Sequence, residues 1–135
     1  YRNQDFVAEV LRHTGGRGVD VVLDMVGGPY AGRNLTAMAP FARLCYIAGD
    51  AGPEANFNIR EIMMKRIVIT GSTLRPRSHE EKALIGKAVE REVWPLIEQG
   101  RIKPVVDCVF PLAQAGEAQA KMAGSSHIGK ILLTP

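Results

Sequence analysis

The fold is decided by the stretch Val19-Asp20-Val21-Val22-Leu23-Asp24-Met25-Val26, which ends at Gly27-Gly28-Pro29. Six of these eight residues are apolar, and four of the six are valines. A strand with so few polar positions needs cover on both of its faces, as in a parallel sheet that is flanked by helices. The stretch therefore predicts a parallel strand at 19–26 that is closed by a glycine turn.

The same unit repeats twice further along the chain. Helical spacing over 30–38 precedes an apolar run at 44–49, and helical spacing over 59–63 precedes another apolar run at 66–72. An amphipathic helix over 5–14 leads into the first strand. Strands that are separated by helices cannot pair as hairpins, so they form a parallel sheet with right-handed crossovers. The sequence therefore predicts an α/β fold with helices on both faces of the sheet.

The last third of the chain has a different pattern. Ser78 and Glu81 have the spacing of a helix capping box, and the helix behind them is expected to bend at Pro95 and to end at Gly100. The following residues predict a strand at 105–110, a helix of small residues at 113–123 and a last strand at 130–134. The tail is therefore expected to form a strand-helix-strand segment.

Composition and charge exclude several classes of protein. With 46% hydrophobic and 23% charged residues over 135 positions, the chain is neither disordered nor collagen-like. Its 17 Lys and Arg against 14 Asp and Glu leave a net charge of +3, which is spread too thinly to suggest nucleic acid. No apolar run approaches the roughly 18 residues that a membrane span needs. We therefore expect neither nucleic acid nor a membrane as a partner.

The cysteines and histidines give no sign of a metal site. Cys45 and Cys108 lie in apolar, strand-like surroundings, without the paired spacing of a zinc site or a disulfide framework. His13, His79 and His127 have no Cys, Asp or Glu at ligand spacing. We therefore expect no bound metal, and a reducing, cytoplasmic setting.

Glycines follow all three strands of the predicted sheet, in the segments 25–28, 47–50 and 71–74. The carboxyl ends of the strands in an open parallel sheet form the ligand crevice, and glycines allow a ligand to approach the backbone there. The same glycines also serve as plain turns, so both interpretations stay open. None of the three segments places a nucleophile beside a base, so we expect binding rather than covalent chemistry, and no catalytic residue.

Several charged residues near these strands have two interpretations. Asp24 either accepts backbone hydrogen bonds near the glycine turn or acts as an acid or base, and the first role is favoured. Arg75 and Arg77 either meet a phosphate or acidic substrate or form a solvated face, and the solvated face is favoured. Lys65 and Arg66 are most simply interpreted as protection of a strand edge.

Four segments, taken together and in this order, resemble a known family. They are Gly-Gly-Arg-Gly-Val-Asp-Val-Val-Leu-Asp-Met-Val-Gly-Gly (15–28), Ala-Arg-Leu-Cys-Tyr-Ile-Ala-Gly (42–49), Ile-Thr-Gly-Ser-Thr-Leu-Arg-Pro-Arg-Ser (69–78) and His-Ile-Gly-Lys-Ile-Leu-Leu (127–133). The chain resembles the carboxyl-terminal half of a medium-chain dehydrogenase/reductase, specifically of the zinc-independent NADPH:quinone oxidoreductase branch.

The resemblance implies two domains and a function. Residues 1–100 would form a partial Rossmann-like, doubly wound parallel sheet that lacks its Gly-rich first half, and 101–135 would return toward a missing substrate domain. The parent protein would transfer hydride from NADPH to a quinone or another conjugated carbonyl, with NADH not excluded and no zinc expected. The chain alone, which would supply the nicotinamide side of the cofactor site, is expected to be inactive.

The resemblance also implies cofactor contacts, which we follow from the adenosine end to the nicotinamide end. Tyr1 matches an aromatic residue near the adenosine end. Met25 and Gly27 match the turn beside the adenosine ribose and pyrophosphate, where many relatives have Ser in place of Met25. The remaining contacts are Ile47, Ala48 and Gly49 along the nicotinamide half, Thr73 and Leu74 at the carboxamide, and Ile128, in a turn that closes over the cofactor.

A second hypothesis is that the chain is a structural module without retained cofactor binding. Strand 19–26 would lack its neighbour, and strand 66–72 would be the other edge, through which relatives of the family often dimerise. An unpaired edge is a template for pairing with another chain. This hypothesis predicts a homodimer or a higher association through the exposed sheet edges.

Overall fold

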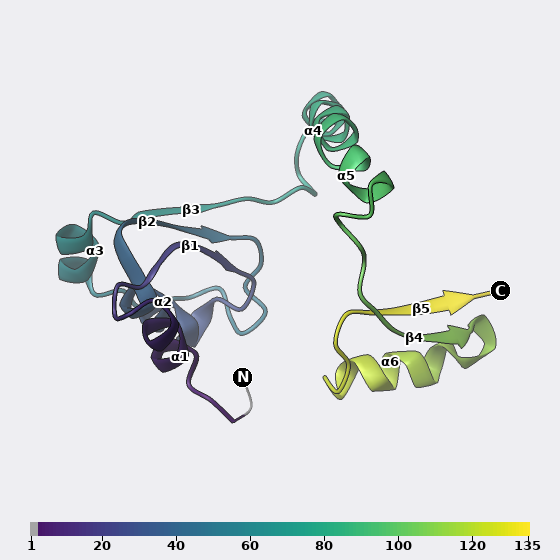
Figure 1. Cartoon of the computed structure of the whole chain (residues 1–135), viewed down its shortest axis with the longest axis horizontal. Coiled ribbons are helices and arrows are strands. Elements are labelled where there is room, and N and C mark those ends of the chain that lie inside the picture. Colours follow the sequence, from purple (N-terminus) through teal and green to yellow (C-terminus); the bar gives the residue numbers. More distant parts are fainter. Residues whose placement is uncertain (1–2) are drawn as a thin grey trace. The chain divides into compact units, whose positions relative to one another are not determined.

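The structure, a computed structural model, describes residues 3–135 (Figure 1). The chain forms two compact units, one up to Arg77 and the other from Ser78 to Pro135. Both units contain parallel strands with helices between them, so the predicted α/β class is confirmed. The expected division into residues 1–100 and 101–135 stays a prediction.

The first unit is a three-stranded parallel sheet with helical crossovers (Figure 1). The strand order is β1-β2-β3, so β1 and β3 are the two edges of this sheet, as the sequence predicted. Its elements are α1 (Phe6–His13), β1 (Val19–Asp24), η1 (Gly28–Tyr30), α2 (Ala31–Ala37), β2 (Met38–Tyr46), α3 (Ile59–Lys65) and β3 (Val68–Gly71).

Side chains from α2 and β2 form the core of the first unit. Leu35, Met38 and Leu44 are fully buried, and Ile67 packs with them. The faces of β1 are less covered than the sequence predicted, because Val21 is 66% exposed and other large apolar side chains of this strand are exposed as well. Within residues 3–135, the cover that this strand needs is therefore incomplete.

β2 begins earlier and ends earlier than the predicted strand at 44–49. It starts at Met38, and Pro40 lies inside it rather than separating it from α2. The register jumps, since Val19 lies opposite Met38 whereas Val21 lies opposite Arg43. The extra residues bulge out of the ladder, and a bulge tolerates a proline because no N–H is needed there.

Lys65 corrects the interpretation of the 65–66 pair as edge protection. Its ammonium donates hydrogen bonds to the carbonyl oxygens of Leu35 (2.6 Å) and Thr36 (3.3 Å), at the carboxyl end of α2. It also pairs with Glu61 of α3, at 2.9 Å. A cation is favourable beside the carbonyl oxygens at the carboxyl end of a helix, so Lys65 ties α3 to α2.

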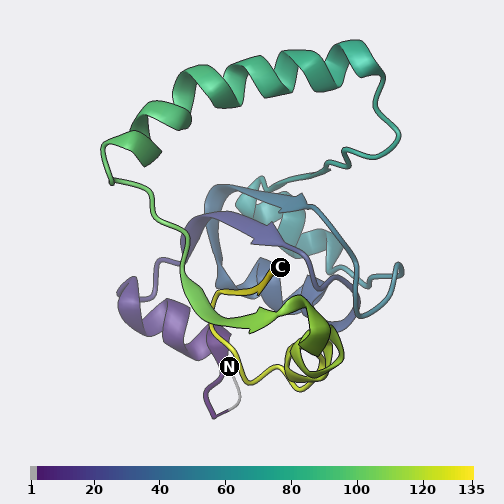
Figure 2. The same ribbon diagram turned by 90° about the vertical axis from the view of Figure 1, so that its right-hand side faces the viewer.

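The second unit starts with two consecutive helices, α4 (His79–Glu92) and α5 (Trp94–Glu98), with the predicted bend between them (Figure 2). The predicted capping box is present, because the Ser78 hydroxyl accepts from the Glu81 N–H (3.2 Å) and the Glu81 carboxylate accepts from the Ser78 N–H (3.0 Å). Pro95 stands in the first turn of α5, where its missing N–H costs no hydrogen bond.

The predicted strand-helix-strand segment follows. The parallel strands β4 (Val106–Pro111) and β5 (Lys130–Thr134) are joined through η2 (Leu112–Gln114) and α6 (Ala115–Ala123), and α6 packs along both strands (Figure 1). Within residues 3–135, no helix is long and apolar enough to cross a lipid bilayer.

Candidate functional site

The three turns that follow β1, β2 and β3 meet at the carboxyl edge of the sheet. The N–H of Ile47 donates to the carbonyl of Asp24 (2.8 Å), and the N–H of Ala51 donates to the carbonyl of Val26 (2.8 Å). On the other side, the N–H of Ser72 donates to the carbonyl of Tyr46, also at 2.8 Å. The pairing of the strands thus continues into the turns and holds their backbones side by side.

Gly27 is required where the first two turns cross. Its φ of 66° and ψ of −151° lie in a region that only glycine adopts readily. A Cβ atom at this position would lie 3.1 Å from both the Cα of Gly49 and the carbonyl oxygen of Gly52. The positive φ and the close approach of two backbones therefore make a side chain costly here.

Asp24 holds the Gly27 turn in place, which confirms the favoured structural role. Its side chain is buried, and its Oδ1 accepts hydrogen bonds from the N–H groups of Val26 (2.6 Å) and Gly27 (3.1 Å). Its Oδ2 accepts from the side-chain amide of Asn34, at 2.7 Å. Both carboxylate oxygens are thus engaged with neighbouring groups.

Tyr46, the last residue of β2, brings a buried hydroxyl to this cluster. Within residues 3–135, no group meets the full hydrogen-bond geometry with this hydroxyl, and the Asn34 amide lies close enough to act on its pKa in the lowering direction. Burial and, next to it, the Asp24 carboxylate raise the pKa of Tyr46 above its ordinary value. The phenol is therefore neutral at physiological pH.

Two hollows open at this edge. The first, which we call the carboxyl-edge cavity, has a volume of about 460 Å³ and brings together Gly27, Ala48 and Gly49. The second, which we call the outer hollow, has a volume of about 410 Å³ and brings together Ile47, Ala48 and Thr73. Tyr46 lines both. Five of the nine predicted cofactor contacts are therefore gathered at one edge.

The other predicted contacts lie elsewhere. Met25 is half exposed and lines a separate cavity of about 450 Å³ along β1, together with residues of α1. Leu74 is exposed, and its carbonyl accepts from the N–H of Arg77 at 3.2 Å. Ile128 belongs to the second unit, is 81% exposed and donates its N–H to Asp107 at 3.0 Å. Tyr1 lies outside the described residues.

Arg77 braces the turn after β3. Its Nε donates to the carbonyl of Thr73 (3.0 Å), and its terminal nitrogen donates to the hydroxyl of Ser72 (3.2 Å). The guanidinium thus orders the backbone of the turn that lines the outer hollow. This local role is neither of the two that the sequence suggested.

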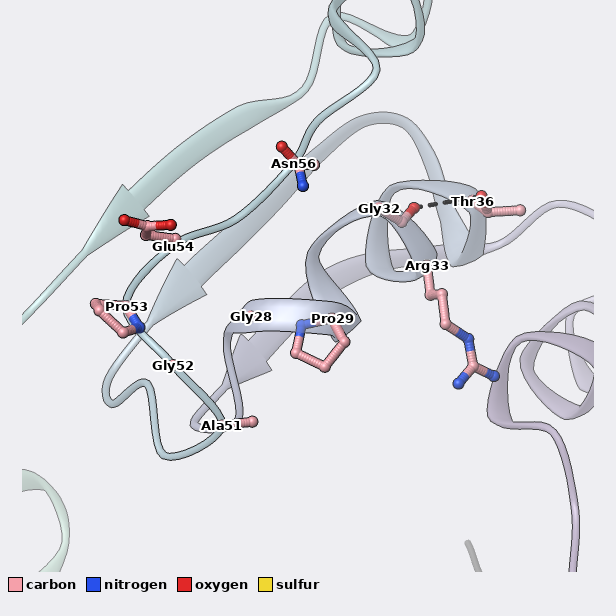
Figure 3. A pocket seen from close by; sticks show the side chains of 10 residues that line it. All are labelled: Gly28, Pro29, Gly32, Arg33, Thr36, Ala51, Gly52, Pro53, Glu54 and Asn56. Atoms are coloured by element: carbon pink, nitrogen blue, oxygen red, sulfur yellow. Dashed lines mark hydrogen bonds between the residues drawn. The ribbon is translucent and has the colours of Figure 1, made fainter.

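A further cavity, of about 750 Å³, lies between the start of α2 and the loop 51–56 (Figure 3). The Arg33 side chain, the one cation among the described lining residues, points away from that loop and toward α1 (Figure 3). There it pairs with Asp5 at 2.5 Å and lies over the Phe6 ring, 4.6 Å from its centroid. Because that guanidinium is engaged with α1, the described lining of the cavity leaves no free cation for an anionic ligand.

Three side chains at the site were missed by the sequence interpretation. Tyr46 and Phe57 supply aromatic walls of the carboxyl-edge cavity, and Asn34 supports Asp24. One signal was available for Asn34, because it interrupts the apolar face that Ala31 and Leu35 define on α2, and a buried polar residue needs a partner. Phe57 lies in a loop, where periodicity carries no signal.

The chain is similar in sequence to a known protein family and to known proteins. The family model described as "Zinc-binding dehydrogenase" matches residues 1–133. The chain is 30% identical over 149 residues to the synaptic vesicle membrane protein VAT-1 homolog of Danio rerio, covering 99% of this chain and 30% of that protein. It is 25% identical over 134 residues to the quinone oxidoreductase of Homo sapiens, covering 98% and 39% respectively.

A solved structure described as an NAD-dependent alcohol dehydrogenase superposes with a TM-score of 0.73 and 27% identity, over 100% of this chain and 36% of that one. The chain therefore spans between 30% and 39% of the length of these proteins.

Proposed function

Because the chain belongs to the zinc-binding dehydrogenase family, within the medium-chain dehydrogenases/reductases, we propose that it holds the nicotinamide half of NADPH in a larger oxidoreductase. That parent protein transfers hydride from NADPH to a quinone or another conjugated carbonyl. The observation that carries the proposal is the meeting of three glycine-containing turns at the carboxyl edge of a parallel sheet, which is where such sheets bind ligands.

The site fits a nicotinamide cofactor in shape and in chemistry. Gly27 and Gly49 line the carboxyl-edge cavity at the crossing of two turns, so a ligand meets backbone rather than side chains there. The walls of Tyr46, Phe57 and Ile69 offer apolar surface to a flat ring. The bound cofactor supplies the hydride, and the residues of the chain orient the ring and exclude water from it.

Among the described residues that line the carboxyl-edge cavity, the one ionisable side chain is the Tyr46 phenol, whose pKa is raised. The carboxyl-edge cavity is lined without any carboxylate, amine, imidazole or thiol from residues 3–135. We therefore assign no catalytic residue to this chain. In our proposal, the chain positions the cofactor and the isolated chain has no turnover.

Zinc, which the family description names, does not fit the side chains of this part of the protein. Residues 3–135 contain no group of three or more His, Cys, Asp and Glu side chains that could hold a metal ion. We derive no step through zinc. Because Cys45 and Cys108 are both free thiols, we retain a reducing, cytoplasmic setting in the proposal.

The test is a titration of the purified chain with NADPH, and with NADH beside it, followed by nicotinamide fluorescence. We expect saturable binding. Ala48→Phe, which fills both hollows, should weaken it by about tenfold or more. Ala51→Phe is the matched control, because Ala51 lies in the same loop but lines the cavity of Figure 3 instead. Absence of binding, or equal weakening by both variants, would refute a retained half-site.

A second candidate function is association through the sheet edges. It is favoured by the apolar surface of the two edge strands, where Leu23 of β1 is 60% exposed and Val68 of β3 is 48% exposed. We propose a homodimer that forms through these edges. Sedimentation equilibrium across a wide concentration range tests it, and a strictly monomeric chain at the highest concentration would exclude it.

A further inference from the structure

Arg77 differs from the other residues of the turn that follows β3. All residues from 71 to 76 are exposed, whereas Arg77 is partly buried. Its side chain donates to the carbonyl of Thr73 (3.0 Å) and to the hydroxyl of Ser72 (3.2 Å). Its own N–H donates to the carbonyl of Leu74, at 3.2 Å. One residue thus contacts three consecutive residues of the turn.

The contact with Thr73 also fixes the direction of the next N–H. The peptide bond between Thr73 and Leu74 is trans, and the C=O and N–H of a planar trans peptide point in opposite directions. Because the Thr73 carbonyl points toward the guanidinium, the N–H of Leu74 points away from it. Within residues 3–135, no group accepts this N–H. Arg77 therefore orients a backbone donor that is open to a ligand.

The same turn lines the outer hollow at the carboxyl edge. Ser72 and Thr73 lie on one side of this hollow, and Ile47 and Ala48 lie on the other. The guanidinium itself is outside the described lining of the hollow. Any effect of Arg77 on a ligand there is therefore transmitted through the turn.

We propose that Arg77 is a positioning residue for the carboxamide of the bound nicotinamide. The inference rests on the proposed function, in which the nicotinamide half of the cofactor lies at this edge. A carboxamide carries an acceptor oxygen, to which the Leu74 N–H can donate. Arg77 holds that N–H in a fixed direction before the cofactor arrives. The turn then need not be ordered on binding, which would otherwise reduce the affinity.

The shape of the guanidinium, and not only its charge, is needed for this role. Its nitrogens form a planar fork that serves the Thr73 carbonyl and the Ser72 hydroxyl at once. The ammonium of a lysine is a compact charge that lacks this fork. A residue that only attracted the cofactor phosphates would be replaced equally well by lysine, so the two roles predict different results for Arg77→Lys.

The experiment titrates the whole chain with NADPH and follows binding by nicotinamide fluorescence and the Leu74 amide by NMR. In the wild type, the Leu74 amide resonance should shift as NADPH binds, because the N–H gains an acceptor. Arg77→Met should weaken binding about tenfold and remove that shift, and Arg77→Lys should weaken binding several-fold. Arg17→Met is the matched control, because it removes the same charge before β1, where Arg17 pairs with Asp20 at 2.6 Å. It should leave binding unchanged.

Arg77→Lys decides the matter even if Arg77→Met does not fold. Wild-type affinity in Arg77→Lys would overturn the proposal, since a positive charge would then be sufficient, and so would wild-type affinity in a folded Arg77→Met chain. A Leu74 amide that does not respond while the wild type binds NADPH would overturn it as well. Absence of NADPH binding by the wild type would refute the proposed half-site and this inference together, whereas binding that is insensitive to Arg77 would refute this inference alone.

Discussion

The exchange of Gly27 for alanine tests whether the crossing of two backbones builds the carboxyl edge. The change adds one methyl group at a buried position. That methyl would lie 3.1 Å from the Cα of Gly49 and 3.1 Å from the carbonyl oxygen of Gly52. The backbone at Gly27 would also be forced to hold its φ of 66° and ψ of −151° with a Cβ atom.

The cost has two parts. A non-glycine residue in this region of backbone space costs about 1–3 kcal/mol, and crowding by one methyl in a packed site costs about 1–3 kcal/mol. The free energy of unfolding of the first unit should therefore fall by about 3 kcal/mol. For a unit of this size, that corresponds to a drop in Tm of roughly 12–24 °C.

The assay combines thermal unfolding by circular dichroism with hydrogen exchange. Exchange is read at the N–H groups of Ile47 and Ala51, which bond to the carbonyls of Asp24 and Val26 across the two turns. Both amides should lose protection in Gly27→Ala. Gly86→Ala is the matched control, because Gly86 lies inside α4 with nothing within 4 Å of an added Cβ. It should stabilise the second unit by about 0.5–1 kcal/mol.

An unchanged Tm together with unchanged exchange at Ile47 and Ala51 would refute the reasoning. It would mean that the turns can separate at little cost, and that Gly27 is a replaceable turn residue. A loss of protection confined to these two amides, with an unchanged Tm, would refute the magnitude and leave the local contact standing.

Three further predictions address other contacts. Lys65→Met removes charged hydrogen bonds to the carbonyls of Leu35 and Thr36. The free energy of unfolding, measured by urea denaturation, should fall by about 2 kcal/mol. An unchanged urea midpoint would contradict the role of Lys65 in tying α3 to α2. The pKa of Asp107 in the folded state is lowered to about 2, chiefly by the Lys121 ammonium at 2.6 Å. The contribution of its carboxylate to stability is therefore fully present above about pH 4 and is lost as the pH falls from about 4 to about 2. The difference in Tm between the wild type and Asp107→Asn should shrink over that window and stay constant above it. Tyr46→Phe removes a buried hydroxyl that meets no partner at full hydrogen-bond geometry among the described residues, so the free energy of unfolding in urea should stay unchanged or rise by up to about 1 kcal/mol. A decrease would show that the Asn34 amide or a water molecule pairs with the hydroxyl.

Local patterns in the sequence predicted the elements and their order well. The apolar run at 19–26 contains β1, and Ser78 and Glu81 form the predicted capping box at the start of α4. The role of Asp24 followed from its place in an apolar strand before two glycines, because a buried carboxylate needs donors and the turn provides them. Such features depend on neighbours within a few residues, so periodicity and spacing are enough to find them.

The contacts between distant segments, on which the candidate site also depends, were decided only by the tertiary structure. Nothing in the local pattern joins Lys65 to the end of α2, 30 positions earlier, or Lys121 to Cys108, 13 positions earlier. Both depend on how helices pack on strands, and the second depends in addition on a bulge that turns Asp107 to the face of Cys108. Sequence by itself determined which segments are strands and helices, because that choice is made by short-range sterics and burial. The register of the strands and the packing of the helices determined which side chains meet, because those are properties of the folded pairing and not of any one segment.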